Sequence, residues 1–133
     1  MIVAKSVEMN RRFYYGRRTM KKEITIGNVS IPVQASAFTP FAYRNQTGRE
    51  LLEDLMEMQT SIEQIQADEN SAPRLVSSLL SKILELAYVM NAEADSSVKD
   101  FKTWLKQFEG ILETNEWLAE VVSVAASTFR RSN

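Results

Sequence analysis

The sequence predicts a mostly α-helical protein, in which an N-terminal β-hairpin is followed by a bundle of about five to six helices. Two short runs near the start alternate polar and apolar residues around a Gly-Asn pair. Most of the remaining chain carries apolar residues at helical spacing. With 133 residues in all, we expect residues 20–133 to form a single domain.

The hairpin is predicted from residues 23–26 and 29–35, which both have the two-residue period of a half-buried strand. Between them, Gly27 and Asn28 tolerate the positive φ angles of a tight turn. Pro32 falls on the face opposite the apolar residues and cannot donate to a ladder. The second strand is therefore expected at the edge of a sheet.

Two helices are predicted next. Thr39 is a candidate N-cap with Pro40 in the first turn, and Gly48 should end this short helix. A longer helix should span residues 49–67. Its apolar stripe is expected to hold Leu51, Leu52, Leu55, Met58, Ile62 and Ile65, with Glu53, Asp54 and Glu57 on the solvated side.

The second half of the chain predicts further helices after a linker at residues 68–73. Residues 75–90 are apolar nearly all round, which is typical of a central helix. Residues 97–100 resemble a capping box, and Gly110 should close the helix that follows. The last helix is expected to begin at Asn115 as N-cap. Trp104 and Trp117 are expected in the core.

Composition argues against an enzyme. The chain has no Cys and no His, which removes thiol nucleophiles, the usual general base and the commonest metal ligands. Scattered glycines form no phosphate-binding loop. We therefore expect no cofactor, no metal and no small-molecule substrate. No apolar run is long enough to cross a membrane, so the protein is expected in the cytoplasm without a membrane partner.

Residues 1–19 differ from the rest of the chain. They carry five basic side chains and one acidic one, a net charge of +4, whereas residues 20–133 have a net charge of −5. Gly16-Arg17-Arg18 can be encoded by a purine-rich ribosome-binding sequence just upstream of Met20. We therefore expect residues 1–19 to be a translated leader that precedes a natural start at Met20. The alternative is a basic N-terminal extension without fixed structure.

The order of motifs resembles a known family. Lys22-Glu23-Ile24-Thr25-Ile26-Gly27 opens the hairpin, Thr39-Pro40-Phe41-Ala42-Tyr43-Arg44-Asn45 follows, and then Gly48-Arg49-Glu50-Leu51-Leu52-Glu53-Asp54-Leu55. This string is similar to the tail assembly chaperones of long-tailed phages and prophages of Gram-positive bacteria. The resemblance is closest over residues 22–56 and looser up to about residue 130. Glu50 stands where the family pattern has Asp.

The resemblance implies a non-enzymatic chaperone in the host bacterial cytosol. It would bind and solubilise the tape measure protein, a very long helical chain, until tail tube subunits polymerise around it. The tail tube protein is a second candidate partner, and self-association into a homo-oligomer is compatible with the role. The alternative function is a nucleic-acid-binding or regulatory helical protein that uses the basic N-terminal arm. The net charge of −5 on residues 20–133 argues against a nucleic-acid partner.

Four residues are candidates for partner binding. Met56 and Met58 could supply an adaptable apolar surface, although both are equally natural as core residues. Tyr43 and Arg44 could contact a partner. Alternatively, Tyr43 packs on the hairpin while Arg44 pairs with an acidic side chain.

Overall fold

The computed structural model describes residues 20–67 and 73–129, and within them it confirms the mostly helical fold class with an N-terminal hairpin. The expected leader at residues 1–19 and most of the expected linker lie outside the described residues. The elements are β1 (Met20–Ile26), β2 (Val29–Ala35), α2 (Thr39–Thr47), α3 (Leu51–Ala67), α4 (Pro73–Ala94), α5 (Phe101–Leu105), α6 (Glu116–Ala126) and the short 3₁₀ helix η2 (Ser127–Phe129).

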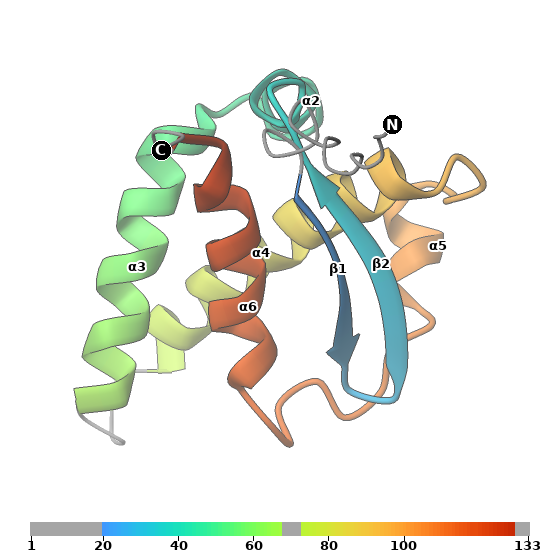
Figure 1. The fold of residues 1–133 in the computed structure, drawn as a ribbon. Helices are drawn as coiled ribbons and strands as arrows, with labels where there is room; N and C mark the ends of the chain where they lie inside the picture. The colour runs from blue at the N-terminus through green and yellow to red at the C-terminus, as the bar shows by residue number, and fades with distance from the viewer. Residues whose placement is uncertain (1–19, 68–72, 130–133) are drawn as a thin grey trace, which may run out of the picture.

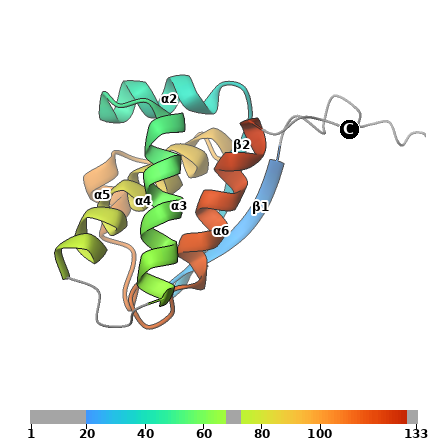
Figure 2. The same cartoon turned by 90° about the vertical axis from the view of Figure 1, so that its left-hand side faces the viewer.

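The helices pack on one face of the hairpin (Figure 1). Helix α4 contacts β2, while α6 lies beside β1 and separates the hairpin from α3. Helix α2 crosses the upper end of the bundle, as the view turned by 90° shows (Figure 2). Because α4 contacts β2, α2, α3, α5 and α6, its predicted central position is confirmed.

The hairpin is antiparallel and longer than predicted, because β1 begins at Met20 rather than Glu23. Pro32 pairs with Glu23 across the ladder. Proline has no N–H, so this pair cannot be a hydrogen-bonded one, and the polar groups of Pro32 point away from β1. The buried Asn91 side chain on α4 uses this arrangement and donates to the Pro32 carbonyl over 2.7 Å.

The hairpin turn docks on the loop that follows α5. Gly27 has φ +61°, and a Cβ placed on it would lie 2.0 Å from the Glu109 carbonyl oxygen. Asn28 Oδ1 accepts a hydrogen bond from the Glu109 N–H over 2.7 Å. Glycine is therefore required at position 27 both for the backbone angle and for this close approach.

Two predicted helix starts are corrected, and a third is confirmed. Thr39 does not cap α2: it is buried, and its Oγ1 accepts from the Ser36 N–H and donates to Glu93 on α4. Asn115 is the N-cap residue of α6, as predicted, although its side chain makes no capping hydrogen bond. The helix expected after residue 97 begins only at Phe101, where Asp100 accepts from the Thr103 N–H. The Thr39 hydroxyl thus bonds the Glu93 side chain on α4 and not the free N–H groups at the start of α2.

Both tryptophans lie in the core, as predicted. The Trp104 indole N–H donates to Asn91 over 2.8 Å, and the Trp117 N–H donates to the Ile111 carbonyl over 2.9 Å. Trp104 also joins an aromatic cluster that binds α5 to α4. Its other rings are those of Tyr88, Phe101 and Phe108.

Candidate functional site

A polar network surrounds Arg49 and is made of the side chains of Tyr43, Arg49, Asp54 and Glu85. Asp54 Oδ2 accepts from the Tyr43 hydroxyl over 2.6 Å and from Arg49 Nε over 2.7 Å. Arg49 Nη2 donates to Glu85 Oε1 on α4 over 2.8 Å. This Arg49 network ties α2, α3 and α4 together at one point.

The electrostatics of the Arg49 network favour a structural role. Burial, followed by the hydrogen bond to Asp54, raises the pKa of Tyr43 well above its ordinary value. Hydrogen bonds to Asp54 and Glu85 raise the pKa of the Arg49 guanidinium above its ordinary value, which is already high. Tyr43 is 0% exposed, so its hydroxyl cannot reach a substrate or a partner in this structure.

The raised pKa of Tyr43 predicts an alkaline loss of stability. In the unfolded chain the phenol ionises near pH 10, whereas in the folded protein it stays protonated to higher pH. The folded state then binds more protons, so the free energy of unfolding falls as pH rises above about 10, by up to about 1.4 kcal/mol per pH unit. Tyr43→Phe should remove this component. Denaturant unfolding of both proteins between about pH 8 and 12 measures it, and parallel curves would contradict the assignment.

Two residues of α3 lie on the opposite side from that predicted. Asp54, expected on the solvated side, is buried in the Arg49 network. Leu52, expected in the apolar stripe, is 51% exposed. The spacing of residues in the sequence could have predicted that Asp54 is buried, because positions 51, 54, 55 and 58 fall on one helical face. An aspartate inside that stripe indicates a buried partner, here Tyr43 and Arg49.

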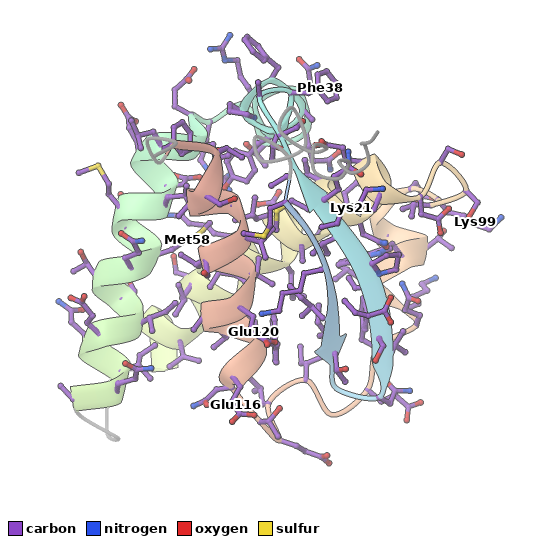
Figure 3. All side chains as sticks on the ribbon, viewed as in Figure 1. Lys21, Phe38, Met58, Lys99, Glu116 and Glu120 are labelled. Carbon is purple, nitrogen blue, oxygen red and sulfur yellow. The ribbon has the colours of Figure 1, made fainter. Side chains whose placement is uncertain are left out.

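The four candidate binding residues divide into two pairs. Tyr43 and Met58 are 0% exposed, which corrects the expectation that they are available to a partner. Met58 lies on the side of α3 that faces α6 (Figure 3). Arg44 forms an ion pair with Glu50 over 2.8 Å, which agrees with the alternative prediction that it pairs with an acidic side chain. Met56 is 62% exposed and is the apolar candidate that remains available to a partner.

Helix α3 presents an accessible face that no described element covers. We call this face the α3 outer face, and it is formed by exposed side chains at helical spacing. Leu52 and Met56 lie one turn apart on it, 51% and 62% exposed. Its members are Leu52, Glu53, Met56, Gln59, Thr60 and Glu63.

A groove of about 390 Å³ between α3 and α4 adjoins the α3 outer face. Lys82 on α4 and Glu57 on α3 form an ion pair that links the two helices there. Leu79 contributes an apolar side chain from α4. The remaining lining residues are Met56, Met58, Thr60, Ser61 and Ser78.

Among residues 20–67 and 73–129, no group of three or more acidic side chains is placed to hold a metal ion. None of the described helices is long and apolar enough to cross a membrane.

In comparisons with known proteins, no family model matches the chain, and no curated protein or solved structure shows a significant match. The class that the structure defines is a helical bundle with an N-terminal hairpin and a partly apolar α3 outer face.

Proposed function

We propose that this protein is a non-enzymatic tail assembly chaperone that binds apolar helical segments of a phage tape measure protein and keeps that protein soluble. The α3 outer face is the proposed binding surface. The tail tube protein, which displaces the chaperone when it polymerises, is the proposed second partner. The resemblance over residues 22–56 supplies the identity of the client.

The observation that carries the proposal is the exposure of Leu52 and Met56 one turn apart on α3. An amphipathic helix binds a partner helix through apolar side chains at this spacing. Methionine is unbranched and adapts to differently shaped apolar surfaces, as a chaperone for a long and varied client requires. The adjoining groove provides room for client side chains.

The Arg49 network supports the proposal indirectly, because it holds the proposed binding surface in one orientation. Arg49 holds the start of α3 against α2 and α4, which fixes the direction in which the α3 outer face points. A binding surface that is held rigidly loses less entropy when a partner docks.

Met56→Asp should weaken client binding without unfolding the protein. Because Met56 is 62% exposed, the aspartate remains in water when the chain is alone, but it would be buried without a partner against an apolar client. We expect the affinity for a tape measure fragment to fall by about tenfold or more. The measurement is the soluble yield of the co-expressed tape measure protein, with pull-down of the complex.

Leu112→Asp is the matched control. Leu112 is 65% exposed in the loop before α6, so its replacement removes a similar apolar surface and adds the same charge away from α3. This variant should solubilise the client as the unchanged protein does. If Met56→Asp folds and still solubilises the client, the binding surface lies elsewhere. One example is the surface of Phe38, just before α2, and Phe41 on α2, which are 59% and 58% exposed.

A further inference from the structure

All the charged side chains of α3 are acidic. Between Leu51 and Ala67 the helix contains four acidic side chains and no Lys or Arg. Asp54 is paired inside the Arg49 network, and Glu57 pairs with Lys82. Glu53 and Glu63 are exposed, and no basic side chain among the described residues pairs with either of them. The apolar pair on the α3 outer face is therefore accompanied by two negative charges that no basic side chain of the described residues balances.

We propose that the α3 outer face selects amphipathic client helices whose apolar stripe is flanked by Lys or Arg. This inference rests on the proposed function and names the chemistry of the segment that binds. Leu52 and Met56 would contact the stripe, while Glu53 and Glu63 would meet basic side chains beside it.

The positions of the two glutamates suit this arrangement. At 100° per residue, Leu52, Met56 and Glu63 lie within about 40° of one another around the helix axis, and Glu63 is two turns beyond Met56. Glu53 lies about 60° to the side of Met56, at the border of the apolar pair. A client helix that packs along α3 thus meets one carboxylate beside its apolar contact and another further along.

Charge at the rim of an interface acts mainly on partner choice and on association rate. A client helix with acidic flanks would bring like charges together at Glu53 and Glu63, which disfavours it. The preference for basic flanks should weaken at high ionic strength, because exposed charges are screened beyond a few ångströms in about 1 M salt.

The test uses three synthetic helical peptides with the same leucine stripe and flanks of Lys, Gln or Glu. Binding to the full chain is measured by fluorescence anisotropy at low and at high salt. The Lys-flanked peptide should bind about three- to tenfold more tightly than the Gln-flanked one at low salt, and the Glu-flanked one should bind most weakly. The double variant Glu53→Gln/Glu63→Gln should remove the differences.

The control is Glu113→Gln/Glu116→Gln, which makes the same charge change at two exposed positions. Glu116 is the first residue of α6 (Figure 3), and Glu113 lies in the loop before it. This variant should keep the preference for Lys flanks. If the three peptides bind equally, or if none binds, the inference is overturned. The proposed function fails separately, when Met56→Asp leaves tape measure solubilisation intact. Loss of the preference in the control variant as well would also overturn the inference, because charge selection would then not lie at α3.

Discussion

Ile83→Ala should lower the free energy of unfolding by about 2–5 kcal/mol. Ile83 is 0% exposed in the middle of α4, the helix that contacts the hairpin and every other α-helix of the described chain. The substitution removes three buried carbon atoms and leaves a cavity among well-packed neighbours, which cannot collapse without moving several elements. Urea unfolding followed by circular dichroism measures the change in the transition midpoint.

Leu80→Ala, one turn earlier on α4, is the comparison. Leu80 is only partly buried and packs at the border of the core, so its loss should cost clearly less than that of Ile83. The sequence alone predicted both positions as core. Equal costs at the two sites, or a cost below about 0.5 kcal/mol for Ile83→Ala, would contradict the position of α4.

The second large effect is expected at Asp54. Asp54→Ala should destabilise the fold by about 3–5 kcal/mol, because it leaves the buried Tyr43 hydroxyl and one side of the Arg49 guanidinium without their acceptor. The expected loss is similar in size to that of a large core residue, although the side chain removed is small and polar. Thermal and urea unfolding should agree on the magnitude.

Glu53→Ala tests the same chemistry one residue away. Glu53 is exposed and has no basic partner among the described residues, so its removal should change stability by less than about 0.5 kcal/mol. A similar loss at both positions would mean that the charge of α3, rather than the Arg49 network, sets the stability. A negligible loss at Asp54 would show that the network contributes little.

The local pattern of the sequence determined the elements of the fold. Alternation around Gly27 and Asn28 predicted the hairpin, and the all-round apolar character of residues 75–90 predicted the central helix. Both signals are periodic and repeat over many residues, so the geometry of a strand or helix can be read from them without knowledge of the partners. Gly48 likewise ends α2 with φ +77°, as its position predicted.

Helix starts and buried polar groups were decided by tertiary structure. Thr39 is a good cap by residue type, yet it does not cap α2, because a hydroxyl group bonds whichever partner the fold brings near. Thr39 instead bonds Glu93, which lies 54 residues away in the chain. Sequence spacing contains no information about such a pairing.

The candidate site shows the same division. Helical periodicity placed Met58 in the apolar stripe of α3, but it could not tell whether that stripe would be covered by other helices or left open to a partner. Packing of α6 against α3 buries Met58 completely and leaves Met56 62% exposed. Periodicity fixes only the angle of a side chain around its own helix. Which angles face solvent depends on where the neighbouring helices lie, and that is a property of the folded chain alone.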